Sequence, residues 1–273
     1  MTRESLVVFA CLVLAAVPGV AADKLKALII DGQNNHRWQE TTPVLKKILE
    51  DSGLFVVTVA TAPPGPDMSG FHPDFAAYDV VVSNYNGLAW PDETKAAFEK
   101  YVRDGGGFVS YHAADNAFPD WPAYNEMIGV GGWGGRKNAE GKPCGHHGDR
   151  LPFQVTMRDD GSPLAHGLPA VWMHAPDELY DTLCGPAKNM DVVATAHSDP
   201  ANKGTGNNEP MLMTLHYGRG RVFHTTLGHD VAAMQSVDFI ATFARGAEWA
   251  ATGQVTQKVP DDFPRADQIS LRK

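Results

Sequence analysis

Three histidines of this chain stand just after apolar segments, where their side chains could take part in catalysis. His36 follows the segment at residues 24–30, His112 ends the stretch GGGFVSYH, and His229 follows GRVFHTTLG. Neutral imidazoles bind divalent ions such as zinc, often as a set of three with one coordination position left open. Imidazole is also the usual proton-transfer group near neutral pH. Because the chain has no compact motif such as HExxH, proton transfer and metal binding remain alternatives.

Amide side chains and one carboxylate accompany these histidines. Asn34, Asn84 and Asn116 lie next to apolar segments and are candidates for binding substrate hydroxyl groups. Asparagine is also common in turns, so a structural role is the alternative for each of them. Asp115 follows His112 by three residues and is a candidate acid, or a group that orients the histidine.

A long segment at residues 117–149 is rich in glycine and tryptophan and has little periodicity. A loop of this length in a compact domain is usually functional or disordered, and its tryptophans favour an ordered, functional loop. Trp121 and Trp133 are candidates to stack on a bound ligand. His146 and His147 would point in opposite directions on an extended segment. We place His147 at the site, as a candidate for substrate or metal binding. The sequence does not decide which of His146 and His147 faces the site.

The stretch WMHAPDELY supplies two further candidates. His174 is a candidate substrate ligand, and Glu178 is a candidate general acid or base. The alternative is that the carboxylates of this stretch only cap a strand turn. A metal, if bound, would be zinc or a similar divalent ion, with candidate ligands His112, His147 and His229.

The first half of the chain alternates short apolar runs with segments of helical periodicity. This alternation predicts an open, mostly parallel sheet with right-handed crossovers and helices on both faces. Ligands of such sheets bind at the carboxyl ends of the strands, which is where the candidate residues stand. We expect strands at residues 24–30, 54–60, 78–85 and 108–111, and helices that begin at Thr42 and at Pro91.

The second half predicts extra strands followed by one long helix. A Gly-Arg-Gly sequence at residues 218–220 indicates a hairpin between the last two strands, and these two are therefore antiparallel. The expected strands lie at residues 151–157, 177–183, 190–196, 210–217 and 220–227, and the helix at about 232–250.

Residues 1–22 are expected to be a signal peptide. Arg3 precedes an apolar run too short to span a membrane, and small residues at Val20-Ala21-Ala22 predict cleavage after Ala22. We therefore expect a periplasmic or secreted protein with a single α/β domain at residues 23–260 and a tail at 261–273. The chain has 273 residues, of which 43% are hydrophobic, enough for one sizeable core.

Charge and cysteine content bound the partners and the redox state. The formal net charge of -9 argues against nucleic acid and anionic membranes as partners, and leaves a neutral sugar open. Beyond the predicted signal peptide the chain has Cys144 and Cys184. In an exported protein they could pair, and two free or buried thiols are the alternative.

Several long motifs resemble the ThuA-like (trehalose utilisation) family. They are ALIIDGQNNHRWQETTPVLKKILE, HAADNAFPDWPAYNEMIG, GGWGGR, GHHG, HAPDELYD, EPMLMTLHYGRGRVFHTTLGH and GAEWAATG. The resemblance implies a flavodoxin-like, class I glutamine amidotransferase-like three-layer sandwich. It also implies carbohydrate metabolism, with trehalose or 3-keto sugars as substrates and a sugar oxidoreductase in the same pathway.

One departure from amidotransferases decides against glutaminase chemistry. Such enzymes need a cysteine nucleophile after the fourth strand, and this chain has His112 there. We expect an enzyme that performs proton-transfer or metal-assisted elimination, isomerisation or hydrolysis on a sugar or 3-keto-glycoside. His112 would be the central base or ligand, with His36 and His229 assisting and Glu178 or Asp115 as acid. The alternatives are a non-catalytic sugar-binding module and a scaffold for a partner oxidoreductase.

Overall fold

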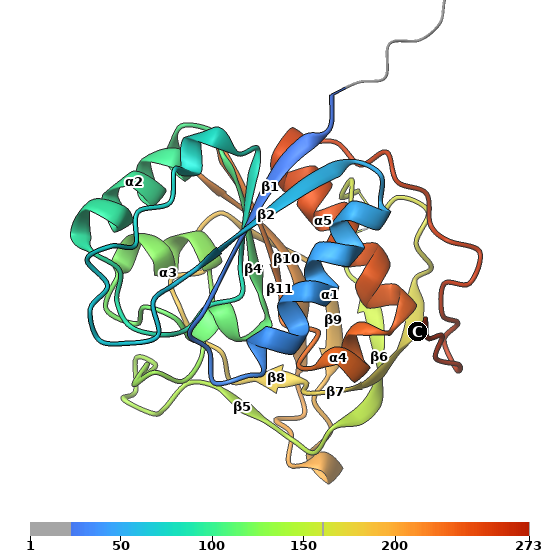
Figure 1. Ribbon diagram of the computed structural model, residues 1–273. Helices are drawn as coiled ribbons and strands as arrows, with labels where there is room; N and C mark the ends of the chain where they lie inside the picture. The colour runs from blue at the N-terminus through green and yellow to red at the C-terminus, as the bar shows by residue number, and fades with distance from the viewer. Residues whose placement is uncertain (1–22, 160, 273) are drawn as a thin grey trace, which may run out of the picture.

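A mixed nine-stranded sheet forms the centre of the protein, seen in a computed structural model that describes residues 23–159 and 161–272 (Figure 1). The predicted signal peptide lies outside the described residues. The strand order is β2-β1-β3-β4-β11-β10-β9-β6-β7. The first five strands in this order are parallel, and the remaining four pair antiparallel. The strands are β1 (Leu25–Asp31), β2 (Phe55–Thr61), β3 (Val80–Ser83), β4 (Gly107–Tyr111), β6 (Leu151–Met157), β7 (Val171–Asp177), β9 (Met190–His197), β10 (Asn208–Tyr217) and β11 (Gly220–Thr225).

Helices cover both faces of the sheet and complete a three-layer sandwich (Figure 1). In β1, Ala27 and Ile29 pack into the core under α1 (Trp38–Asp51) and α5 (Val237–Thr252), whereas Leu28 and Ile30 pack into the core under α2 (Asp92–Arg103) and α3 (Pro122–Ile128). This alternation follows from the period of two in a strand, and it explains why residues 27–30 of β1 are a continuous apolar run. The helices are α1 (Trp38–Asp51), α2 (Asp92–Arg103), α3 (Pro122–Ile128), α4 (Val231–Met234) and α5 (Val237–Thr252).

The predicted fold class is confirmed. The start of the first helix differs from the prediction. Helix α1 begins at Trp38 instead of Thr42 and therefore contains Pro43. The hydroxyl groups of Thr41 and Thr42 do not cap the helix, because each accepts a hydrogen bond of 3.0 Å from the Asn84 side chain. Pro43 removes only one backbone donor near the start of the helix, a loss that the packing of the following turns outweighs.

Two other predicted elements are corrected by the structure. No strand runs through residues 177–183, since β7 ends at Asp177 and only β8 (Tyr180–Asp181) is extended, pairing with β5 (His146–His147). The helix expected at 232–250 is two helices, α4 and α5. The predicted tail is held by backbone hydrogen bonds, from Val237 to Ser270 O (3.0 Å) and from Met173 to Arg265 O (2.8 Å).

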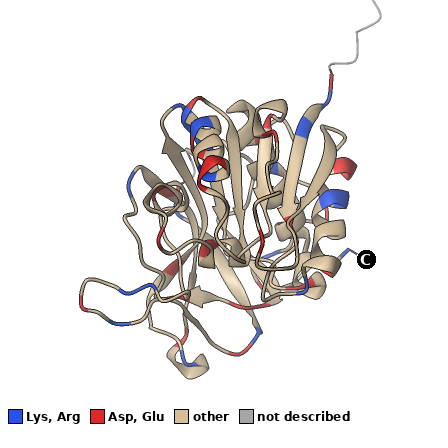
Figure 2. Cartoon of the chain, turned by 60° about the vertical axis from the view of Figure 1, so that its left-hand side comes forward, with Lys and Arg blue, Asp and Glu red and all other residues tan. Residues whose placement is uncertain are grey.

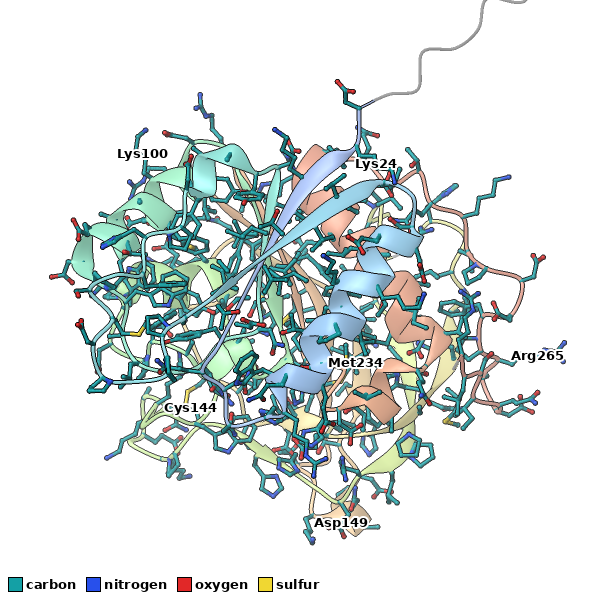
Figure 3. The ribbon with its side chains drawn as sticks, in the orientation of Figure 1. Lys24, Lys100, Cys144, Asp149, Met234 and Arg265 are labelled. Carbon is teal, nitrogen blue, oxygen red and sulfur yellow. A yellow bond between two sulfur atoms is a disulfide. The ribbon has the colours of Figure 1, made fainter. Side chains whose placement is uncertain are left out.

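Lys and Arg residues, and Asp and Glu residues, are distributed over many elements of the chain (Figure 2). In the part of the chain that the structure describes, no helix has the length and apolar character needed to cross a membrane. The parallel strands end at the edge of the sheet opposite Lys24, where Figure 3 labels Cys144 and Asp149. Loops from distant parts of the sequence meet at this edge, and they form the site.

Candidate functional site

A cavity of about 900 Å³ opens at the carboxyl edge of the parallel strands. This is the position at which open α/β sheets bind ligands. Polar side chains dominate its wall, and Trp133 and Tyr180 add aromatic surface. The lining residues are Asn35, His36, Arg37, Glu40, Asn86, Asn116, Trp133, Gly134, His147, Arg150, Glu178, Tyr180, His229, Asp230, Val231 and Ala232.

Four side chains converge at the inner end of the cavity, and we call them the histidine–glutamate cluster. One donor atom from each lies within 4.8 Å of the donor atoms of the other three. The four residues come from loops after β1, β4, β7 and β11, so only the folded sheet assembles them. The cluster consists of His36, His112, Glu178 and His229.

His112 forms the buried part of the cluster, with 1% of its side chain exposed. It directly follows β4 with a φ of 43°, a conformation that costs energy for a residue with a Cβ and is typical of functional turns. Its Nδ1 lies 2.6 Å from Thr226 O, which can only accept, so Nδ1 carries the proton. The Nε2 lone pair is then free to accept from the Tyr180 hydroxyl at 2.8 Å. Burial lowers the pKa of His112, which keeps the ring neutral.

His36 is held in the matching tautomer. Its Nδ1 lies 3.1 Å from the side-chain oxygens of both Asn34 and Asn35, and these oxygens can only accept. The Nε2 lone pair is therefore free, and the ring stands edge-on to His112 and His229. Burial, followed by repulsion from those two rings, lowers the pKa of His36 to about 3. His36 is thus a neutral ligand or acceptor at physiological pH.

Glu178 lies between the histidines. Its Oε2 is 3.0 Å from His229 Nδ1 and 3.8 Å from His112 Nε2, and its Oε1 is 3.6 Å from His147 Nε2. Burial alone would raise the pKa of Glu178, but the neighbouring histidines outweigh it and lower the pKa. Although it is this close to the carboxylate, His229 Nδ1 has no hydrogen-bond partner among the described residues.

A buried ion-pair network supports the loop that carries His229. The carboxylate of Asp177 accepts hydrogen bonds from the backbone N–H groups of Gly228 (2.6 Å) and His229 (3.0 Å). His174 lies between Asp177 and Asp238, at 2.9 Å and 2.8 Å. Burial disfavours the protonated form of His174 and by itself would lower its pKa. The two carboxylates outweigh burial and raise the pKa of His174 to about 10. His174 is completely buried, so its predicted role as a substrate ligand is wrong, and the imidazolium supports the loop instead.

Two predicted amides position the loop and do not line the cavity. Asn84 is buried, accepts a hydrogen bond of 3.0 Å from Asn34 and donates to the threonines of α1. Asn34 also accepts from the backbone and the ring of His36. The predicted substrate-binding role is therefore corrected to one of holding His36. Asn116, in contrast, lines the cavity, and its Oδ1 has no partner within the described part of the chain.

Asp115 and Trp121 are two further corrections. Asp115 is buried, and its carboxylate faces His224 at 3.6 Å instead of His112. The reason is the 3₁₀ turn at residues 112–116, which rotates this side chain below the sheet edge. Trp121 lies outside the cavity wall, because its ring packs against Phe118 at 5.4 Å and in the core under α2 and α3.

The long glycine-rich loop brings Trp133 and His147 to the cavity. The Trp133 ring lies 4.6 Å from that of Tyr180 and 6.1 Å from that of His147. A Cβ on Gly145 would meet the indole at 2.7 Å, so the glycine is needed for this packing. The sequence left the two adjacent histidines undecided. His147 faces the cavity, whereas His146 faces Asp181 at 3.0 Å.

Tyr180 and the charged pairs at the cavity mouth are candidate site residues that were not predicted from the sequence. In the extended segment predicted at 177–183, the period of two places Tyr180 on the same side as Glu178, and this signal could have found it. Two ion pairs stand at the mouth, Arg37 with Glu40 three residues along the chain, and Arg150 with Asp230, which come from distant segments and had no such signal. In each pair the positive arginine and the negative carboxylate cancel in charge, and a cavity mouth without net charge from these pairs suits a neutral ligand.

Comparisons with known proteins agree with this architecture. A family described as "ThuA: Trehalose utilisation" matches residues 26–250. A ThuA-like protein from Parabacteroides merdae is 47% identical, with 92% of this chain and 98% of that protein covered and a TM-score of 0.88. No curated protein sequence matches the chain.

More distant structures share the fold alone. A ThuA-like protein from Bacteroides uniformis is 19% identical over 88% of this chain and 97% of that protein, with a TM-score of 0.64. A β-galactosidase from Rahnella sp. R3 is 16% identical over 88% of this chain and 33% of that protein, with a TM-score of 0.53. The family match spans the sheet, both helical layers and every loop of the cluster, and the chain therefore belongs to the ThuA (trehalose utilisation) family.

Proposed function

We propose that the protein is an exported enzyme that acts on a neutral sugar or 3-keto-glycoside in the cavity. One observation carries the proposal: three imidazoles and a carboxylate converge at the inner end of a cavity whose wall includes a half-buried indole. A sugar-binding module would need the indole and the amides but not the cluster. The family description, trehalose utilisation, supports a carbohydrate as the substrate class.

His147 is the residue best placed to transfer a proton. Its Nδ1 donates to Gly148 O at 2.8 Å, so the Nε2 lone pair is available on the cavity side. Glu178 Oε1, 3.6 Å from this nitrogen, would stabilise the imidazolium that forms. The other three histidines stand deeper, where the Nε2 lone pair of His36 could accept a hydrogen bond from a substrate hydroxyl group.

The chemistry begins with a proton next to a carbonyl. Removal of the C2 proton of a 3-keto-glycoside leaves its electron pair in an enolate of the C3 carbonyl. When this pair forms the C1–C2 double bond, the C1–O bond breaks, and the departing alcohol takes a proton from the imidazolium. Isomerisation shares the first step, and addition of water to the double bond completes a net hydrolysis. An oxidoreductase that oxidises C3 of a glycoside would supply the substrate.

The test is turnover of glycosides and of their 3-keto forms by the purified protein. His147→Ala should lower kcat by about 10²- to 10⁴-fold while sugar binding persists. His146→Ala is the matched control, because the adjacent histidine faces Asp181 and should leave kcat unchanged. Binding of the sugars without any turnover would overturn the enzyme and leave a binding module.

Export is tested separately. We expect the mature protein to begin at Asp23, after cleavage behind Ala22. Amino-terminal sequencing of protein recovered from the periplasm or the medium checks this, and recovery of the intact chain in the cytoplasm would contradict it.

A further inference from the structure

The donor atoms of the histidine–glutamate cluster are arranged as ligands and not as an ordinary hydrogen-bond network. In a network, each lone pair faces a donor proton. Here one ligand atom from each of the four residues lies within 4.8 Å of the others, and although the Tyr180 hydroxyl faces His112 Nε2 at 2.8 Å, the Nε2 lone pair of His36 faces no donor among the described residues. Lone pairs that converge in a partly buried place repel one another unless a cation lies between them.

Groups outside the cluster fix the two inner rings for this purpose. The Nδ1 proton of His112 is held by Thr226 O, and that of His36 by the side-chain oxygens of Asn34 and Asn35. Metal-bound histidines typically donate their second ring N–H to a carbonyl or carboxylate in this way, which sets the tautomer and the ring orientation. Both rings therefore present Nε2 without any change of protonation.

The contact between His229 and Glu178 points to the same conclusion. Their closest atoms are 3.0 Å apart, yet the buried His229 nitrogen makes no hydrogen bond in the described part of the chain. A cation bound by both groups would satisfy the nitrogen lone pair and the carboxylate charge together.

We propose that the histidine–glutamate cluster binds one divalent first-row transition-metal ion of the zinc type. Three nitrogens and one carboxylate oxygen suit zinc, cobalt, nickel, manganese or iron, whereas calcium and magnesium prefer oxygen ligands. Ligand atoms around a tetrahedral zinc stand about 3.3 Å apart. The donor atoms lie within 4.8 Å of one another, so side-chain shifts of about 1 Å are enough to close the shell.

The Tyr180 hydroxyl competes with the proposed ion for His112 Nε2. It donates to His112 Nε2 at 2.8 Å and so occupies the lone pair that the ion needs. Binding must break this hydrogen bond. Tyr180→Phe should therefore tighten metal binding by about 2- to 10-fold, the net worth of one hydrogen bond. A purely structural role of the cluster predicts no such gain.

The ion would face the cavity, because His36, Glu178 and His229 all line it. An oxygen of the substrate could then join the ion, whose charge would stabilise the enolate of the proposed reaction. Only this catalytic use rests on the function proposed above. The binding of the ion stands on the geometry of the cluster alone.

The experiment measures metal binding directly, with full-length mature protein stripped by a chelator. Zn²⁺ and Co²⁺ are titrated by calorimetry, and the visible absorption of bound Co²⁺ reports nitrogen ligation. We expect about one ion per chain. His36→Ala and His229→Ala should each weaken binding by about 100-fold or more, and His147→Ala, just outside the cluster, should not. His36 and His229 are chosen because His112 is buried and its replacement could prevent folding.

The outcomes separate the two proposals. Failure to bind either ion, or equal loss in the His147→Ala control, would overturn the metal site. Turnover that persists in stripped protein would overturn its catalytic use while the enzyme proposal stands. Stoichiometric binding, lost in the two ligand variants, with no turnover of any sugar would confirm the site and overturn the enzyme proposal.

Discussion

The disulfide between Cys144 and Cys184 should contribute a large part of the stability of the cavity wall. It joins the loop that carries Trp133 to the segment after β8, across 40 residues of sequence. Backbone hydrogen bonds accompany it, from Trp133 to Cys144 O (2.7 Å) and between Gly131 and Cys184 in both directions (3.0 Å each). We predict that the double variant Cys144→Ala/Cys184→Ala is markedly less stable than the native protein.

The magnitude follows from the length of the closed loop. For about 40 residues, the entropy that a crosslink removes from the unfolded chain corresponds to about 4 kcal/mol at 25 °C. This is a large share of the 5–15 kcal/mol that typically separates folded from unfolded domains. Cys144 is almost completely buried, so its truncation leaves a small void that adds to the loss.

Urea unfolding, followed by tryptophan fluorescence and far-ultraviolet circular dichroism, measures the difference in the free energy of unfolding. A reducing agent should lower the stability of the native protein by a similar amount and leave the double variant unchanged. Thiol titration of the unreduced native protein should find no reactive pair. The reasoning is refuted if two thiols titrate, or if the two proteins unfold with free energies that agree to about 1 kcal/mol.

The remaining predictions concern the buried network and the indole. His174→Gln should lower the free energy of unfolding by about 3–5 kcal/mol at pH 7, because it leaves the carboxylates of Asp177 and Asp238 buried without a cationic partner. Since the pKa of His174 is raised from 6.5 to about 10, its contribution is complete below pH 6.5 and is lost as the pH rises through 10. The difference from the native protein in urea unfolding should therefore shrink across this range, and a constant difference would contradict the role of the imidazolium. Trp133→Ala should weaken sugar binding by about 5- to 30-fold in calorimetry. Gly145→Ala should cause a similar loss by displacing the indole, and unchanged affinity in both variants would place the sugar elsewhere.

Several features of the fold could be predicted because they depend on local composition. Apolar runs near residues 24–30 and 108–111 indicate strands buried on both faces, and their alternation with helices implies a parallel sheet. The rule that ligands bind at the carboxyl edge then selected His36, His112 and His229 from eleven histidines. These three do meet in the structure.

Side-chain direction beyond a strand end could not be predicted in the same way. His174 and Glu178 stand four residues apart in one stretch, yet one is buried in an ion-pair network and the other reaches the cavity. Asp115 turns inward because a 3₁₀ turn follows His112, and no local signal announced that turn. The outcome for each residue depends on partners far away in the sequence, such as Asp238 for His174.

The sequence by itself determined the alternation of strands and helices in the first half of the chain and the edge at which polar side chains would gather, because hydrophobic periodicity is a local property. Only the tertiary structure decided which of those side chains touch, which of His146 and His147 faces the cavity, and that Cys144 pairs with Cys184. The physical reason is that hydrogen bonds, ion pairs and crosslinks act over a few ångströms. They form only where the fold has already brought distant segments together.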